Sequence, residues 1–132
     1  MGDRAASGLL QGILAGAFIA AVLFPAGLLA GNTWRQALNV FYPFGQDAPL
    51  QGLLLHLGVS AVYGSIFGLV QPLIPQRLPG WLAGLGYGVL LFALAEWVLL
   101  PQSQFGMSAL PPLALLLGHG VYGLVRGFRR QE

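Results

Sequence analysis

The sequence predicts an all-α membrane protein in which four transmembrane helices form a tandem, parallel repeat of two helical hairpins. The chain is 56% hydrophobic and 8% charged, with a mean hydropathy of +0.73, whereas a soluble domain carries roughly 25% charged residues. A nine-residue pattern, Ser/His-x-x-Tyr-Gly-x-x-x-Gly, begins at Ser60 and again at His119. We therefore expect a single membrane domain, 1–132, with half-repeats 1–75 and 76–132.

Four apolar stretches are each close to the roughly 20 residues that a helix needs to cross a bilayer. They cover about residues 8–30, 50–73, 80–100 and 109–128. The first resembles a secretory signal, because Arg4 precedes it. Its apolar run is longer than the roughly 7–15 residues of a signal core, so we expect it to be retained as a transmembrane helix.

Glycines recur every four residues in the first and third stretches. The two rows, which we align in order, are Gly8, Gly12 and Gly16, and Gly80, Gly84 and Gly88. In lipid, small residues at this spacing let two helices approach closely and gain van der Waals contact. The repeated pattern supplies partner glycines in the second and fourth stretches, at Gly64, Gly68, Gly123 and Gly127.

The connection between the first two stretches, residues 31–49, is the longest one. Its bulky apolar residues recur at helical spacing, at Trp34, Leu38, Phe41 and Tyr42. This spacing predicts a short helix that lies in the headgroup layer. We interpret the aromatic residues as membrane anchors, with a lid over a substrate as the alternative.

Polar residues share one face of the second and fourth helices. At 100° per residue, Ser60, Tyr63 and Gln71 lie on the side opposite Val62 and Ile66. The fourth stretch repeats this layout, which gives a candidate polar stripe of Ser60, Tyr63, Gln71, Tyr87 and Tyr122. The other interpretation is structural, since hydroxyl groups in a bundle commonly bond to a backbone carbonyl or a facing helix.

The arginines predict the orientation. One side of the membrane receives Arg4, Arg77, Arg126, Arg129 and Arg130, and the other receives Arg35 alone. The positive-inside rule therefore places both termini in the cytoplasm. We expect Arg126 to extend to the lipid phosphates. No basic stripe with interleaved aromatic residues is present, so we do not expect nucleic-acid binding.

Three ionisable residues lie inside the apolar stretches: His56, Glu96 and His119. Together they could bind a divalent metal, transfer protons, or orient a histidine that ligates a haem or a chlorin. Alternatively, the histidines bond to neighbouring helices and Glu96 extends to the interface. The chain lacks cysteine and any HxxxH or HExxH motif, so we predict no metal site and no cofactor. It also lacks a nucleophile with a matching base, so we predict no catalytic residue.

The doubled hairpin and its two motif endings, Tyr63-Gly64-x-x-x-Gly68 and His119-x-x-Tyr122-Gly123-x-x-x-Gly127, resemble small uncharacterised four-span proteins of the bacterial inner membrane. The resemblance implies a helical bundle in the cytoplasmic membrane and supplies no activity. Ser60 stands where the second half has His119, which argues against a symmetric site with two histidines.

We expect a non-enzymatic membrane protein, a small structural or accessory subunit that packs in a larger bioenergetic or transport complex. Its partners would be the lipid bilayer and other membrane subunits, or further copies of itself. One alternative is a small oligomeric channel or transporter with a polar path from Glu96 and His56 to Gln71. The other alternative is a carrier that binds haem or a pigment through a histidine.

Overall fold

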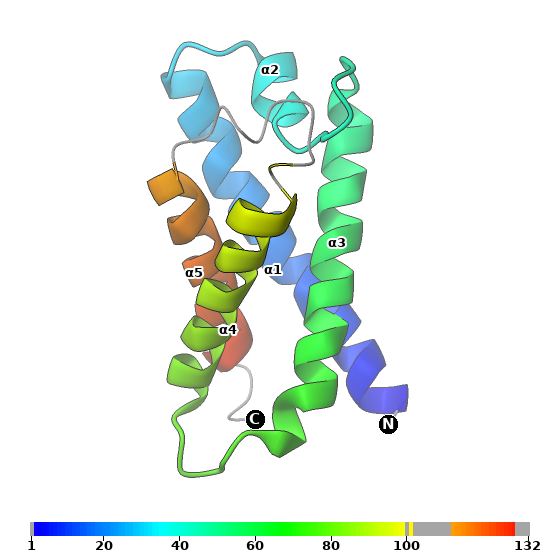
Figure 1. Cartoon of the computed structure of the whole chain (residues 1–132). Coiled ribbons are helices and arrows are strands. Elements are labelled where there is room, and N and C mark those ends of the chain that lie inside the picture. The colour runs from blue at the N-terminus through cyan, green and yellow to red at the C-terminus, as the bar shows by residue number, and fades with distance from the viewer. Residues whose placement is uncertain (1, 100, 102–111, 129–132) are drawn as a thin grey trace.

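The computed structural model describes residues 2–99, 101 and 112–128, and this part of the chain is helical, without strands. The elements in order are α1 (Gly2–Leu29), α2 (Trp34–Asn39), α3 (Pro49–Val70), the 3₁₀ turn η1 (Gln71–Leu73), α4 (Gly80–Leu94), the π-helical turn η2 (Ala95–Leu99) and α5 (Pro112–Phe128) (Figure 1). The predicted all-helical class is therefore confirmed. α1 begins and α5 ends at the end of the bundle opposite α2 (Figure 1).

Within the described residues, three helical segments are long and apolar enough to cross a membrane: Gly2–Leu29, Pro49–Leu73 and Gly80–Leu99. The fold is thus compatible with a membrane-embedded protein. α5 has 17 residues, about 25 Å at roughly 1.5 Å per residue. Residues 109–111 of the fourth expected span lie outside the described residues.

The helices pair into two tight hairpins, a first hairpin of α1 and α3 and a second hairpin of α4 and α5. The helices of each hairpin meet at glycines. A Cβ added to Gly64 would lie 2.6 Å from the Cα of Gly12, and one added to Gly84 would lie 2.7 Å from the Cα of Gly127. These distances are too short for a side chain, so glycine is what allows the two backbones to touch. We call these two rows of backbone contact the glycine seams.

The two glycine seams have the same pattern of contacts, but in a register that differs from the sequence alignment by one helical turn. Gly64 of α3 meets Gly8 and Gly12, whereas Gly123 of α5 meets Gly84 and Gly88. Gly8 therefore corresponds to Gly84, whereas the order of the glycines in the sequence aligns Gly8 with Gly80, four residues away. The register depends on where the motif glycines of α3 and α5 cross the partner helix, and the start of an apolar stretch does not reveal that point.

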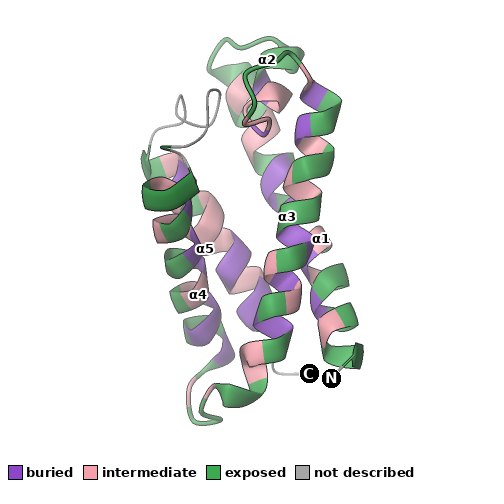
Figure 2. Cartoon of the chain, turned by 45° about the vertical axis from the view of Figure 1, so that its right-hand side comes forward, coloured by how far each residue is buried: buried purple, intermediate pink, exposed green. Residues whose placement is uncertain are grey.

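The two hairpins meet through a small apolar core and through hydrogen bonds, two of which come from tyrosines. The core is formed by Ala15, Ile19, Leu91 and Tyr122. The hydroxyl of Tyr122 donates to the carbonyl of Ser60 at 2.7 Å, and the hydroxyl of Tyr87 donates to the carbonyl of Tyr63 at 2.7 Å. Figure 2 shows the buried residues on the sides of the helices that face one another. Large apolar residues cover the outside, including Leu10, Leu54, Leu90 and Leu117.

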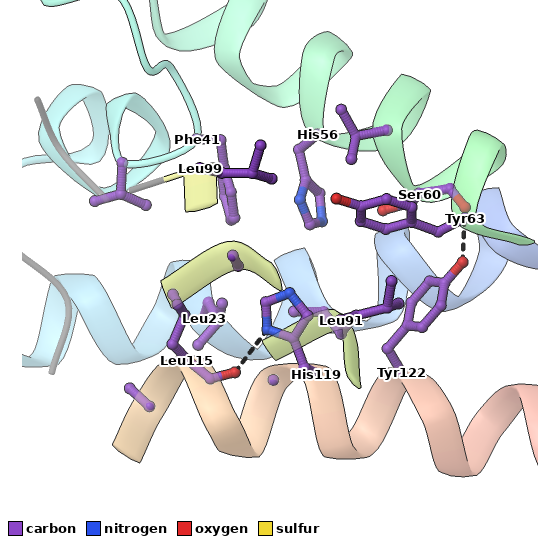
Figure 3. A pocket seen from close by; sticks show the side chains of 16 residues that line it. Leu23, Phe41, His56, Ser60, Tyr63, Leu91, Leu99, Leu115, His119 and Tyr122 are labelled. Atoms are coloured by element: carbon purple, nitrogen blue, oxygen red, sulfur yellow. Dashed lines mark hydrogen bonds between the residues drawn. The ribbon is translucent and has the colours of Figure 1, made fainter. Parts of the chain in front are cut away.

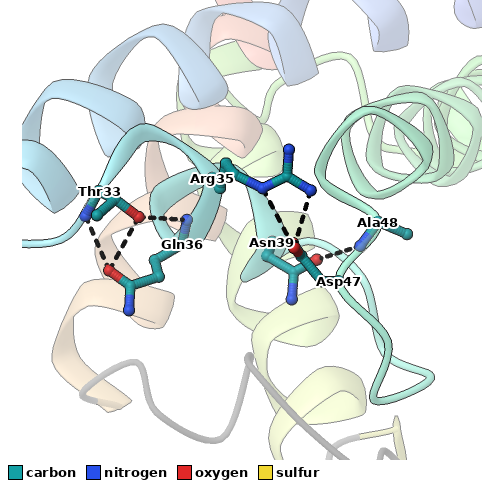
Figure 4. A network of polar contacts seen from close by, with 6 residues as sticks. All are labelled: Thr33, Arg35, Gln36, Asn39, Asp47 and Ala48. Atoms are coloured by element: carbon teal, nitrogen blue, oxygen red, sulfur yellow. Dashed lines mark hydrogen bonds and ion pairs between the residues drawn. The ribbon is translucent and has the colours of Figure 1, made fainter.

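The connection between α1 and α3 contains the short helix that its spacing predicts, now seen as α2. The helix begins with a capping box (Figure 4). Thr33 Oγ1 accepts a hydrogen bond from the backbone N–H of Gln36, and Gln36 Oε1 accepts one from the backbone N–H of Thr33 at 2.8 Å. Arg35 forms an ion pair with Asp47 at 2.8 Å. These contacts fold the connection back over the end of the bundle.

The aromatic residues of this connection do not all lie at the surface. Trp34 is 51% exposed and suits an anchor, whereas Phe41 is 6% exposed. The ring of Phe41 packs against that of His56, with 4.4 Å between centroids. The interpretation of Phe41 as an anchor in the headgroup layer is therefore wrong, because the fold of the connection turns this ring into the bundle.

Candidate functional site

A cavity of about 110 Å³ lies between the two hairpins, next to the connection that carries α2. All four long helices line it, and Val40 and Phe41 contribute from the connection. The walls are largely apolar. The polar side chains among the lining residues are His56, Ser60, Tyr63, His119 and Tyr122 (Figure 3).

His56 reaches the cavity from α3. Its Nε2 lies 3.1 Å from the carbonyl oxygen of Gly16 on α1. A carbonyl only accepts hydrogen bonds, so Nε2 carries the proton that it donates. In the neutral ring, Nδ1 then has a free lone pair and can accept a hydrogen bond or bind a metal. Gly16 makes this approach possible, because a Cβ there would lie 2.6 Å from the Cβ of Ser60.

His119 faces the cavity from α5, on the wall opposite His56. Its Nδ1 donates to the carbonyl of Leu115, one turn earlier in the same helix, at 2.8 Å. The neutral ring therefore has its lone pair on Nε2, which Figure 3 shows directed into the cavity. Each histidine thus has one nitrogen fixed by a backbone carbonyl and one nitrogen able to accept.

The predicted trio of His56, Glu96 and His119 is only partly brought together. The two histidines line one cavity, whereas Glu96 is half-buried in η2 and is not among the lining residues. Ala95 lines the cavity instead, and Glu96 comes next around the π-helical turn. Among the described residues, no group of three or more His, Cys, Asp or Glu side chains could hold a metal ion.

The predicted polar stripe is divided into separate parts. Ser60, Tyr63 and Tyr122 line the cavity. Tyr87 bonds the two hairpins together beyond it, where its ring packs on Phe67 with 4.9 Å between centroids. Phe67 is 1% exposed, and Gln71 lies in η1. An apolar ring therefore separates the cavity from Gln71.

Arg126 is buried, whereas the sequence predicts that it extends to the lipid phosphates. It is 3% exposed and does not extend to the membrane surface. Its guanidinium donates to Oε1 of Gln11 and to the carbonyl of Gly64 at 3.1 Å, and it lies over the ring of Phe67 at 5.1 Å from the centroid. These partners stabilise the charge inside the bundle, so the side chain need not reach phosphate. Arg126 also joins the second hairpin to the first.

Gln11 is the partner of Arg126 that the sequence does not predict. It lies on α1 between Gly8 and Gly12, and its Nε2 donates to Ser7 Oγ at 3.1 Å. A long amide inside an apolar stretch was the available signal, because such a group needs a partner in lipid. Arg129 and Arg130 lie outside the described residues.

Comparison of the chain with protein-family models, with curated proteins and with solved structures finds no match. The function is therefore argued from the geometry of the bundle and its cavity.

Proposed function

We infer that this protein is a non-enzymatic, four-span protein of the bacterial cytoplasmic membrane, with both termini in the cytoplasm, that serves as an accessory subunit of a larger membrane complex. The observation that carries this proposal is a bundle whose interior is closed by packing beyond the cavity, at Phe67 and Arg126, while its outside is apolar on every long helix. Such a body offers surfaces for neighbouring subunits and no route for transport.

Several contacts support four spans built from a duplicated hairpin. α5 meets α4 through the same glycine contacts by which α3 meets α1. α3 belongs to a segment long enough to cross the bilayer. Because α5 occupies the equivalent position in the second hairpin, we expect α5 to cross the bilayer as well. α5 is slightly shorter than the roughly 30 Å hydrocarbon core, a mismatch that flanking residues and local thinning of the bilayer can absorb.

The closed centre argues against the channel alternative. A polar path would have to continue from the cavity towards Gln71, but Phe67, which lies on α3 between Tyr63 and Gln71, is buried. The hydrogen bond from Tyr122 to Ser60 and the contacts of Arg126 join the two hairpins in the same region. Conduction would require these groups to separate.

The dimensions of the cavity argue against the haem or pigment alternative. A cavity of about 110 Å³ is well below the roughly 300–1,000 Å³ of sites for drug-sized ligands, and a macrocycle is larger still. The histidines also do not suit nucleophilic catalysis. In a catalytic triad a carboxylate holds the imidazole and stabilises its positive charge, whereas here a backbone carbonyl holds each ring.

The test is to find what contacts the lipid-facing sides of the helices in the native membrane. A photo-crosslinking residue would be placed at Leu10, Leu54, Leu90 and Leu117, one exposed site on each long helix. Ala15, which is fully buried, is the matched control. After irradiation of whole cells and mild detergent extraction, mass spectrometry would identify every attached chain.

We expect one or two of the exposed sites to attach the same second protein in stoichiometric amounts, and Ala15 to attach none. That result would name the complex and the docking helix. Attachment solely to further copies of this chain, or to no protein at any of the four sites, would contradict the accessory role.

A further inference from the structure

The cavity holds two hydrogen-bond acceptors, one on each histidine, that accept no hydrogen bond from the residues that the structure describes. The carbonyls of Gly16 and Leu115 fix the protonated nitrogens of His56 and His119. The remaining nitrogens, Nδ1 of His56 and Nε2 of His119, carry lone pairs in the neutral rings. Because the cavity is lined mainly by apolar side chains, a polar group left unbonded in it is unfavourable. A ligand that donates hydrogen bonds would remove this penalty.

A metal ion fits these acceptors less well than a neutral donor does. Those lining residues that the structure describes include no carboxylate and no thiolate, so a divalent cation would keep its full charge. An uncompensated charge is costly within an apolar bundle in lipid. Two imidazoles alone also fall short of the three or four ligands that common protein metal sites provide.

The size and walls of the cavity suit a single aromatic ring. An apolar cavity of about 150 Å³ in another protein binds benzene, and the present volume of about 110 Å³ is comparable. Phe41 and the two tyrosines, Tyr63 and Tyr122, supply aromatic surface around the histidines. Flat aromatic surfaces favour another ring through stacked and edge-to-face contacts.

The cavity also communicates with the outer surface of the bundle. Val59 and Leu99 line it and are 39% and 46% exposed. Both lie in segments long enough to cross the membrane. A molecule dissolved in lipid can therefore reach the cavity from the side.

We propose that this cavity binds a membrane-soluble phenol or hydroquinone, whose hydroxyl group donates a hydrogen bond to Nδ1 of His56 or Nε2 of His119. The ring lies between the two hairpins, against Phe41 and Leu91. This assignment goes beyond the accessory role and does not depend on it, because either can hold without the other.

The experiment uses the fact that the chain has two histidines. The full-length protein, labelled with ¹⁵N at histidine, would be placed in lipid nanodiscs and titrated with 4-ethylphenol. The matched probe is 4-ethylanisole, which has almost the same shape but no hydroxyl donor. Both probes are compared at equal concentration in the membrane.

We expect the phenol to shift the resonance of at least one lone-pair nitrogen in a saturable way, with the protonated nitrogens nearly unchanged. The anisole should bind at least tenfold more weakly. Equal binding of the two probes, or no saturable shift with either, would overturn the proposal. A saturable shift of both lone-pair nitrogens with Zn²⁺, in the absence of any response to the phenol, would also overturn it in favour of a metal site.

A cavity-filling variant provides a second, independent measurement. A Cβ at Gly118 would make ordinary contact with Ile19 at 3.7 Å, so Gly118→Leu can extend into the cavity without displacing the backbone. Gly86→Leu is the control, because a Cβ at Gly86 meets nothing within 4 Å. We expect Gly118→Leu to weaken phenol binding at least tenfold and Gly86→Leu to leave it unchanged. Unchanged binding in a folded Gly118→Leu protein would overturn the assignment of the site.

Discussion

The glycine seams make the sharpest prediction about stability, and α3 contains the matched pair of positions that tests it. Gly64 lies where α3 touches α1, whereas a Cβ added to Gly58 would meet nothing within 4 Å. Replacing either residue with alanine changes the helix propensity in the same way. The difference between Gly64→Ala and Gly58→Ala therefore isolates the steric effect at the seam.

The magnitude of this difference follows from the distances. In Gly64→Ala the new Cβ would lie 2.6 Å from the Cα of Gly12 and closer still to the carbonyl oxygen of Gly8, whereas ordinary contact begins at 3.4 Å. The helices must therefore separate by at least about 0.8 Å, and a gap of roughly 0.5–1 Å forfeits a quarter to a half of the dispersion energy of each contact. Overpacking of this kind costs about 1–3 kcal/mol.

The same substitution gains about 0.5–1 kcal/mol from the better helix propensity of alanine. We thus expect Gly58→Ala to be slightly more stable than the parent protein. Gly64→Ala should be about 1–3 kcal/mol less stable than Gly58→Ala.

The assay is reversible unfolding in mixed micelles with increasing SDS, followed by tryptophan fluorescence. The second hairpin provides a replicate, with Gly84→Ala at the seam and Gly86→Ala in open space. If the seam variant and its control had the same free energy of unfolding in both hairpins, the claim that backbone contact holds each hairpin together would be refuted.

Three further substitutions test individual contacts by the same unfolding assay. Arg126→Lys should cost about 1–2 kcal/mol, because an ammonium group cannot serve Gln11 and a backbone carbonyl in the fixed geometry of a guanidinium. Tyr122→Phe should cost about 0.6–1.7 kcal/mol through loss of the hydrogen bond to Ser60. Phe41→Ala should cost about 3 kcal/mol, because it empties a buried position beside the cavity. If a variant had the same free energy of unfolding as the parent protein, the claim that the removed contact stabilises the fold would be wrong.

The all-helical class could be predicted from the sequence because long apolar stretches follow a simple local pattern. Composition and the length of the apolar stretches indicated helices long and apolar enough to cross a membrane, and helical spacing indicated α2 within residues 31–49. The glycine rows also indicated which helix faces touch, and the structure places Gly64 and Gly84 where two backbones meet. These features depend on local pattern, which a single sequence contains.

The details of the site depend on contacts between hairpins, which local pattern does not specify. Arg126 is buried because Gln11 and the carbonyl of Gly64 come from the other hairpin to meet it. Glu96 is separated from the histidines by the π-helical turn, an irregularity that a uniform 100° per residue cannot anticipate. Likewise, Phe41 lies inside because the connection folds back over the bundle.

The most direct test of the proposed four-span architecture is the side of the membrane that each turn occupies. The natural chain has no cysteine, so single cysteines can be introduced without background at Asp3, Gln46, Arg77, Pro101 and Phe128. Each variant would be treated with a membrane-impermeant maleimide in right-side-out and in inverted vesicles.

We predict that Gln46→Cys and Pro101→Cys react in right-side-out vesicles, and that Asp3→Cys, Arg77→Cys and Phe128→Cys react in inverted vesicles. Reaction of Pro101→Cys and Phe128→Cys from the same side would remove the fourth span and contradict the paired-hairpin architecture.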